Sequence, residues 1–132
     1  MIYIDTGAFL GRYLEKDQYH KKALKKWKQV EELKHKCVTS NFVLDETFTL
    51  LGRWGNYKYA AERANLIYSS QVIDILRPDH NDELAAIEMF RKFSDQKISY
   101  TDCISFVLMK KMKIKQAFSF DRHFVAAGFK LY

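Results

Sequence analysis

The sequence has few of the residues that interrupt regular structure: five glycines and one proline occur among its 132 residues. This scarcity excludes a loop-rich or collagen-like chain and favours long helices joined by short connections. Only two cysteines occur, Cys37 and Cys103, which are too few and too far apart in the sequence to form a disulfide framework. We therefore expect two free thiols, as is typical of a protein kept in a reducing cytoplasm.

Long hydrophobic runs are also missing, since no apolar stretch approaches the roughly 18 residues that a membrane span needs. The first residues, Met1 to Asp5, have neither the basic region nor the apolar region of a signal peptide. Apolar residues nevertheless make up 48% of the chain and charged residues 29%, which suits an ordinary buried core. We expect one cytoplasmic domain, residues 1–132, without a membrane partner.

Charge is unevenly distributed along the chain, whose 22 basic and 16 acidic residues give a net charge of +6. Residues 11–36 hold nine Lys and Arg against four acids, and residues 97–132 hold seven against two, whereas residues 37–96 are acidic. A basic excess attracts polyanions, of which nucleic acid is the commonest in a cytoplasm, although surface lysines also serve solubility. The two acids of the last segment, Asp102 and Asp121, lie among apolar or small residues, which favours a site within a basic surface.

Short runs of β-branched and aromatic residues alternate with longer stretches that have apolar residues at helical spacing. This alternation predicts a parallel-type sheet covered by helices, that is, an α/β sandwich. The expected strands are residues 2–4, 37–39, 72–76, 117–120 and 129–132. The expected helices are a short one that ends near residue 14 and five longer ones, at residues 20–36, 41–51, 59–69, 79–93 and 101–112, with Ser40 and Thr101 as caps.

Aspartates follow two of the expected strands at their carboxyl ends, where ligands bind in sheets of this kind. Asp5 ends the first strand, Asp121 comes directly after the strand at residues 117–120, and Asp102 lies in the first turn of a helix. Each aspartate taken singly also has a purely structural explanation, as a strand end, a partner of a helix N-terminus or an Asx turn.

Glu46 is a fourth candidate, because it shares a helix face with Val43 and Leu50, which are expected to point toward the core. A buried carboxylate is costly unless it meets a cation or takes up a proton. No Lys or Arg occurs between Lys36 and Arg53 to neutralise it locally, whereas a metal ion would do so. The structural alternative is a glutamate at the edge of the helix face that is protonated or reaches solvent.

Four carboxylates at one edge of a sheet would suit hard divalent cations, which prefer oxygen ligands. Two such ions about 4 Å apart can hold both the attacking and the leaving oxygen of a phosphodiester. The acids alone would repel a nucleic acid, but bound metal ions reverse the local charge and the surrounding lysines hold the phosphate backbone. The acidic cluster and the basic surface together favour a nuclease.

The segments that contain these acids resemble, in order and spacing, those of PIN-domain ribonucleases: Tyr3-Ile-Asp5-Thr6, Ser40-Asn-Phe-Val-Leu-Asp-Glu46, Tyr100-Thr-Asp102-Cys-Ile-Ser105 and Ser119-Phe-Asp121-Arg-His-Phe124. Over essentially all 132 residues the chain looks like a VapC-type toxin of a toxin–antitoxin pair. This resemblance implies an α/β fold, a three-layer α/β/α sandwich with a central, mainly parallel sheet. It also implies an endoribonuclease that depends on Mg²⁺ or Mn²⁺, forms a homodimer and has a cognate antitoxin as partner.

By the same resemblance, four acids form a catalytic and metal-binding quartet: Asp5, Glu46, Asp102 and Asp121. Thr6 and Ser119 match positions of small hydroxyl side chains beside the acids, where they would orient carboxylates or water. Ser119 stands where many relatives have threonine, and it keeps the hydroxyl.

Residues 53–59 supply a second group of candidates, because this stretch interleaves basic and aromatic side chains. Arg53, Trp54 and Lys58 would offer stacking and phosphate contacts to single-stranded RNA, unless the aromatic residues complete the core between two helices. The four histidines share no metal-ligand spacing with one another or with the cysteines, so no zinc site is expected.

Two other functions remain open on the sequence alone. The same fold would also suit an RNA-binding or partner-binding module without turnover. Asp5 at the end of the first strand suits a phospho-aspartyl phosphotransfer domain, although Gly7 stands where one such class has a second acid. The triplet Asp5-Thr6-Gly7 also occurs in aspartic proteases, which are all-β and so do not fit a mostly helical chain.

Overall fold

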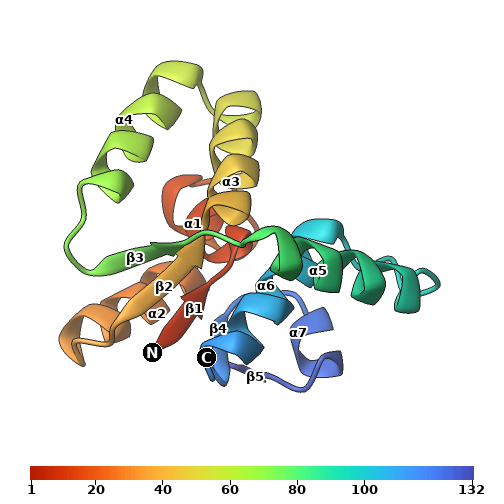
Figure 1. Cartoon of the computed structure of the whole chain (residues 1–132). Coiled ribbons are helices and arrows are strands. Elements are labelled where there is room, and N and C mark those ends of the chain that lie inside the picture. Colours follow the sequence, from red (N-terminus) through yellow and green to blue (C-terminus); the bar gives the residue numbers. More distant parts are fainter.

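The centre of the molecule is a five-stranded sheet in which every neighbouring pair is parallel, with the strand order β3-β2-β1-β4-β5. The computed structural model describes residues 1–132 and is drawn in Figure 1. The strands are β1 (Ile2–Ile4), β2 (Cys37–Ser40), β3 (Ile73–Leu76), β4 (Gln116–Phe118) and β5 (Lys130–Leu131). The helices are α1 (Thr6–Tyr13), α2 (His20–Glu32), α3 (Asn41–Trp54), α4 (Tyr57–Tyr68), α5 (His80–Lys92), α6 (Tyr100–Lys111) and α7 (His123–Ala126).

β1 lies in the middle of the sheet, because it pairs with β2 on one side and with β4 on the other. The chain moves outward from β1 through β2 to β3, then crosses back to β4 and continues to β5 (Figure 1). Since crossovers between parallel strands are right-handed, this reversal puts α1 and α2 on one face and α6 and α7 on the other. The reversal lies between β1 and β4, and ligands bind beyond the carboxyl ends of the strands at such a point.

Buried side chains fix these two central strands against helices from both layers. Tyr3 on β1 is fully buried, and its hydroxyl donates a hydrogen bond to Ser105 Oγ on α6 at 2.9 Å. Trp27 on α2 packs against Phe118 on β4, and its indole N–H donates to the carbonyl of Ala8 at 2.9 Å. The carboxyl ends of β1 and β4 are therefore held at fixed positions, which matters for the residues that follow them.

The predicted three-layer α/β/α architecture is confirmed, and the differences lie at the ends of elements. The strand expected at residues 117–120 ends at Phe118, because Ser119 turns out of the sheet and its side chain contacts Asp5. Ser99, not Thr101, caps α6, with its hydroxyl accepting a backbone N–H at 3.0 Å. The four-residue α7 is an element that the sequence patterns do not predict.

Two helices at the periphery leave apolar surface exposed. α4 packs against α3, whereas α5 packs against α6 and projects away from the sheet (Figure 1). Large apolar side chains on both are exposed, among them Leu66 on α4 and Ile87 on α5. The two cysteines are buried and free, as expected. None of the helices combines the length and the apolar character needed to cross a membrane.

Candidate active site

A cavity of about 510 Å³ opens beyond the carboxyl ends of β1 and β4, where the topology of the sheet predicts a ligand site. All four predicted acids line it, each from a different segment of the chain: Asp5 after β1, Glu46 on α3, Asp102 on α6 and Asp121 after β4. We call it the acidic cavity. The fold thus brings together carboxylates that are far apart in the sequence.

Asp5 lies deep in the acidic cavity and is almost fully buried. Its backbone N–H donates to the carbonyl of Phe118 at 3.1 Å, which ties the end of β1 to the end of β4. The Ser119 hydroxyl donates to Asp5 Oδ2 at 2.7 Å. Burial, followed by the charge of Asp102, raises the pKa of Asp5 to about 7, although the Ser119 hydrogen bond acts in the opposite direction.

Asp102 faces the same cavity from the first turn of α6. The dipole of a helix N-terminus favours a negative charge at this position. Burial, followed by the charge of Asp121 and with a smaller effect of Glu46, nevertheless raises the pKa of Asp102 to about 6. Two carboxyl groups with raised pKa values in one cavity indicate negative charge that no neighbouring cation neutralises, and a bound metal ion would relieve it.

Ser119 connects the two aspartates that follow the central strands. Its hydroxyl donates to Asp5 and accepts the backbone N–H of Asp121 at 3.0 Å, and the side chain is buried. Thr6, the other predicted hydroxyl, also lines the acidic cavity, and its Oγ1 is buried without a hydrogen-bond partner. Ser119 therefore contacts both acids, whereas the Thr6 hydroxyl remains available to a ligand.

Glu46 reaches the acidic cavity from α3 and is half-buried. The predicted helix face is correct in part: Val43 is fully buried, whereas Leu50 is half-buried and lines the acidic cavity beside Glu46. The charge of Glu46 raises the pKa of both Asp5 and Asp102, with which it lines the acidic cavity.

His123 is a member of the site that the sequence spacing does not reveal. Its backbone N–H donates to Asp121 Oδ1 at 2.9 Å, and this turn brings the ring back over the cavity. His123 Nδ1 lies 3.1 Å from Asp121 Oδ1 and 3.8 Å from Asp102 Oδ2, and it has no hydrogen-bond partner. The three residues offer ligand atoms that all lie within 4.8 Å of one another. Its position two residues after Asp121, and not its distance from other histidines, is the signal that points to it.

The donor set of the acidic cavity fits a hard divalent cation. Four carboxylates supply the oxygen ligands that Mg²⁺ and Mn²⁺ prefer, and their mutual repulsion is greatest without a cation. Two polar atoms, Thr6 Oγ1 and His123 Nδ1, have no partner in the protein and line the same cavity. The residues present therefore suit a metal-ion site.

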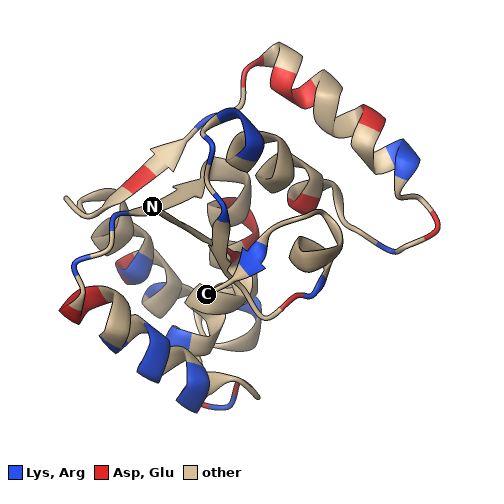
Figure 2. Ribbon diagram, turned by 90° about the horizontal axis from the view of Figure 1, so that it is seen from below, with Lys and Arg blue, Asp and Glu red and all other residues tan.

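Basic residues lie both in the acidic cavity and elsewhere on the surface. Lys97 and Arg122 line the acidic cavity itself. Figure 2 shows further lysines along the outer face of α2, which are mostly exposed: Lys21, Lys22, Lys25, Lys26 and Lys28. An acidic cavity with a basic rim can attract a phosphate backbone to the rim while a cation is held at the acids.

The three weaker RNA-binding candidates lie outside the acidic cavity. Arg53 and Trp54 end α3, and Lys58 lies in the first turn of α4; all three are exposed. Trp54 lines a neighbouring cavity of about 760 Å³, which we call the tryptophan cavity, together with Tyr13 and Tyr59. Neither Arg53 nor Lys58 lines it, so the structure separates Trp54 from the other two.

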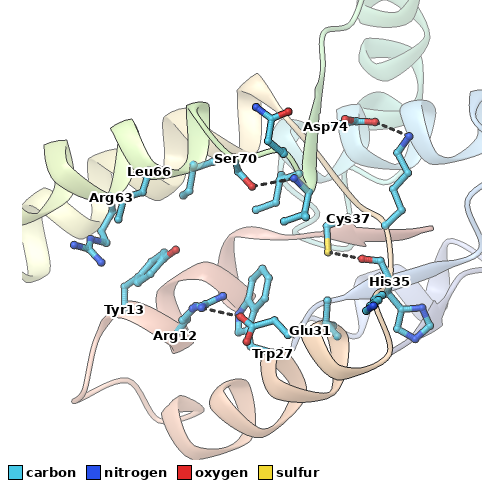
Figure 3. Close-up of a pocket in the computed structure, with 17 residues that line it drawn as sticks. Arg12, Tyr13, Trp27, Glu31, His35, Cys37, Arg63, Leu66, Ser70 and Asp74 are labelled. Carbon is cyan, nitrogen blue, oxygen red and sulfur yellow. Dashed lines mark hydrogen bonds and ion pairs between the residues drawn. The ribbon is translucent and has the colours of Figure 1, made fainter.

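A third cavity, of about 980 Å³, lies at the other end of the sheet, beside the first residues of β2 and β3 (Figure 3). We call it the α4 cavity, because α4 covers it opposite α1 and α2. It contains apolar side chains such as Trp27 and Ile67, and the guanidinium groups of Arg12 and Arg63. Arg12 forms an ion pair with Glu31 at 3.0 Å, whereas Arg63 Nε is buried without a partner. The α4 cavity contains none of the four predicted acids.

Comparison with known proteins identifies the family. A family model described as PIN domain matches residues 2–130. The 23S rRNA-specific endonuclease VapC20 of Mycobacterium tuberculosis is 33% identical over 129 residues, which cover 98% of this chain and 95% of the relative. A VapC ribonuclease of Archaeoglobus fulgidus is 34% identical over 125 residues, which cover 92% of this chain and 77% of the relative.

Solved structures support the same family assignment. The crystal structure of VapC20 from M. tuberculosis, described as a sarcin–ricin loop cleaving toxin, matches with a TM-score of 0.88 and 31% identity over 98% of this chain and 96% of that chain. FitAcB from Neisseria gonorrhoeae matches with a TM-score of 0.71 over 100% of this chain and 96% of that chain, and its 16% identity makes this a likeness of fold. By its sequence and its fold, this chain belongs to the PIN-domain family and, within it, to the VapC type.

Proposed function

We propose that this chain is an endoribonuclease that hydrolyses phosphodiester bonds of RNA with Mg²⁺ or Mn²⁺, and that it is the toxin of a toxin–antitoxin pair. The observation that supports it is the meeting of Asp5, Glu46, Asp102 and Asp121 in one cavity with a basic rim. The relatives of the VapC type are named as ribonucleases, and residues 1–132 would act as one domain.

In this proposal the four acids hold the metal ions, which would activate water and stabilise the charge that develops on the phosphate. Ser119 fixes the direction of the Asp5 carboxylate through its 2.7 Å hydrogen bond. The Thr6 hydroxyl and His123 Nδ1 are unpartnered and would bind water within the site. Lys97 and Arg122 neutralise the phosphates that flank the scissile bond.

The cognate antitoxin is the proposed protein partner, and the α4 cavity is the place that we assign to its chain. The cavity has apolar walls and the Arg63 guanidinium, which lies over the Tyr59 ring and whose Nε has no hydrogen-bond partner, so it suits a segment with apolar and acidic side chains. Tyr13 lines both the α4 cavity and the tryptophan cavity, so a segment seated there can continue toward the acids. If so, co-expression with the open reading frame next to this gene should yield a complex that Arg63→Glu weakens.

A homodimer through α5 is the proposed oligomeric state. Leu84, Ile87 and Phe90 on this helix are each about half exposed. The first turn of the helix holds Glu83 and the buried Asp82, which pairs with Lys111, and the last turn holds Arg91 and Lys92. Two copies packed in antiparallel orientation would bury the apolar side chains and place the acidic start of one helix beside the basic end of the other.

The deciding experiment is cleavage of an end-labelled, structured RNA by the pure protein in Mn²⁺, in Mg²⁺ and in EDTA. Fragments of 23S rRNA come first, because one relative is named for that substrate. Asp102→Asn and Glu46→Gln should abolish the metal-dependent cleavage. Asp45→Asn is the matched control, since Asp45 is exposed and precedes Glu46 on the same helix. RNA binding without cleavage in either metal would instead support a binding module.

A further inference from the structure

Trp54 is exposed by 62%, although it lies beside a cavity with two other aromatic side chains. The close packing of the next residue restricts its position. A Cβ added to Gly55 would lie 2.9 Å from the carbonyl oxygen of Leu51 and 3.3 Å from Leu14, so this turn sits tightly against the end of α1. An exposed indole beside a cavity is a feature of binding surfaces, where it offers a large contact area.

The remaining walls of the tryptophan cavity suit a flat, partly polar ligand. Tyr13 and Tyr59 meet edge to face with their ring centroids 6.5 Å apart. Asn56 accepts the backbone N–H of Tyr59 through Oδ1 at 2.7 Å, which leaves its amide N–H groups as donors. The volume of about 760 Å³ lies within the range usual for sites that take small molecules. Aromatic faces with a few polar groups at their edge are how proteins bind unstacked bases.

The tryptophan cavity lies next to the acidic cavity. Asp17 and Gln18 line both of them. The Asp17 side chain is held by the backbone N–H of Tyr19, which donates to its Oδ1 at 2.8 Å. Lys16 lies on the tryptophan side of this shared wall, and Lys97 lies on the acidic side. A strand of nucleic acid that spans both cavities would meet Lys16 beside one and Lys97 beside the other, and it would pass the carboxylates of Glu15 and Asp17 between them.

We propose that the tryptophan cavity binds one unpaired nucleobase of the RNA, stacked on Trp54, from a nucleotide adjacent to the scissile phosphodiester. The proposal rests on the proposed function, which places that phosphodiester at the acids. It restricts the substrate to RNA in which this nucleotide is free of the helical stack, as in a loop, a bulge or a single strand. An aromatic side chain of a protein partner would also stack on Trp54, but the phosphodiester that the proposed function places in the neighbouring acidic cavity favours a nucleotide.

The test measures RNA binding and tryptophan fluorescence in the Asp102→Asn protein with Mg²⁺, using a fluorescein-labelled RNA hairpin with a purine-rich loop. Trp54 is the exposed one of the two tryptophans, since Trp27 is buried. RNA should therefore quench the emission of the parent protein and leave that of Trp54→Phe unchanged. Trp54→Ala should weaken binding by about 5-fold to 150-fold, the range for loss of one base–aromatic stack, and Trp54→Phe by much less.

Tyr57→Ala is the matched control, because Tyr57 is an aromatic residue exposed by 73% that does not line the cavity. It should bind RNA like the parent. Hairpins with a single abasic nucleotide locate the base that binds. At one loop position, the abasic change should weaken RNA binding as much as Trp54→Ala does. Combining that abasic hairpin with Trp54→Ala should weaken binding no further.

Unchanged RNA binding by Trp54→Ala would refute the nucleobase site, and so would an equal loss in Tyr57→Ala. The loss of a protein partner by Trp54→Ala, with RNA binding intact, would also refute it and would assign Trp54 to that partner. Cleavage by the protein with Asp102 intact reports the proposed function separately. Quenching through Trp54 without any cleavage would leave the nucleobase site standing and refute the nuclease, whereas cleavage that Trp54→Ala leaves unchanged would do the reverse.

Discussion

Replacing Asp5 by asparagine should stabilise the metal-free protein at neutral pH while it removes a ligand of the proposed metal site. The carboxyl group is buried, and its pKa in the folded protein is about 7, against an ordinary value of 3.8. Asparagine has almost the same shape, carries no charge and keeps an oxygen that can accept the hydrogen bond from Ser119. The substitution therefore removes a charge that burial disfavours and preserves the contact that positions the side chain.

The sign and size of the effect follow from proton binding. Because the folded protein holds the Asp5 proton more tightly than the unfolded chain, the contribution of Asp5 to stability is fully present below about pH 4 and is lost as the pH rises through about 7. A shift of about three pKa units corresponds to about 4 kcal/mol in the free energy of unfolding. This loss is a large part of the 5 to 15 kcal/mol that a domain typically has. The asparagine side chain does not titrate, so the Asp5→Asn variant should be more stable than wild type by about 4 kcal/mol at pH 8 and by little at pH 4.

Urea unfolding in EDTA at intervals from pH 4 to pH 8 measures this difference. Asp95→Asn is the control, since Asp95 is exposed and its removal should have little effect at any pH. Adding Mn²⁺ at 100 times its dissociation constant should then stabilise wild type at pH 8 by about 2.7 kcal/mol and leave Asp5→Asn nearly unchanged. A stability difference between Asp5→Asn and wild type that is the same at pH 4 and pH 8 would refute the burial of an uncompensated charge at Asp5.

Three other perturbations test the site and the fold. Metal affinity should fall as the pH is lowered through 7 and 6, by up to about tenfold per pH unit for each proton that the metal displaces from Asp5 and Asp102. Calorimetry in two buffers counts these protons. A metal affinity that does not change with pH would contradict the raised pKa values. Ser119→Ala should weaken metal binding by about 10- to 100-fold, because the Asp5 carboxylate loses the donor that orients it, while Ser119→Thr should restore it. Gly11→Ala should lower the free energy of unfolding by about 1–3 kcal/mol, although alanine favours helices, because its Cβ would lie 2.7 Å from that of Ala23. Urea unfolding measures this change. A stabilised variant would show that α1 and α2 can separate at little cost.

The sequence predicts the fold well because the relevant signals are local. The β-branched runs at residues 2–4 and 37–39 fall in β1 and β2, and the helical periodicity of residues 20–36 predicts α2, which ends four residues earlier, at Glu32. The sequence signals are weakest where tertiary contacts determine the end of an element. The residues that flank Ser119 predict that the strand continues through it. Its hydrogen bond to Asp5, a residue near the other end of the chain, instead turns it out of β4.

The site residues also differ in how well local signals predict them. The sequence predicts four acids that the fold places in one cavity, because each follows a strand or opens toward the core from a helix. It does not reveal His123, Lys97 or Arg122 in that cavity, since their positions depend on how α7 and the segment before α6 pack. It groups Arg53 and Lys58 with Trp54, yet helix geometry points only the indole into the tryptophan cavity.

The metal-free site works against the stability of the fold. Asp5 and Asp102 are buried without a cation within ion-pair distance, apart from His123 at 3.8 Å from Asp102, and both carboxyl groups have raised pKa values. The aromatic core beneath β1 and β4 supplies the stability that such a cluster costs, through fully buried side chains such as Tyr3 and Phe118. Basic residues at the rim cannot relieve the repulsion inside, because any that reached the carboxylates would occupy the place of the metal ion. The arrangement of charges therefore favours a cation that binds and leaves over a permanent ion pair, and it makes stability and metal binding two measurements of the same site.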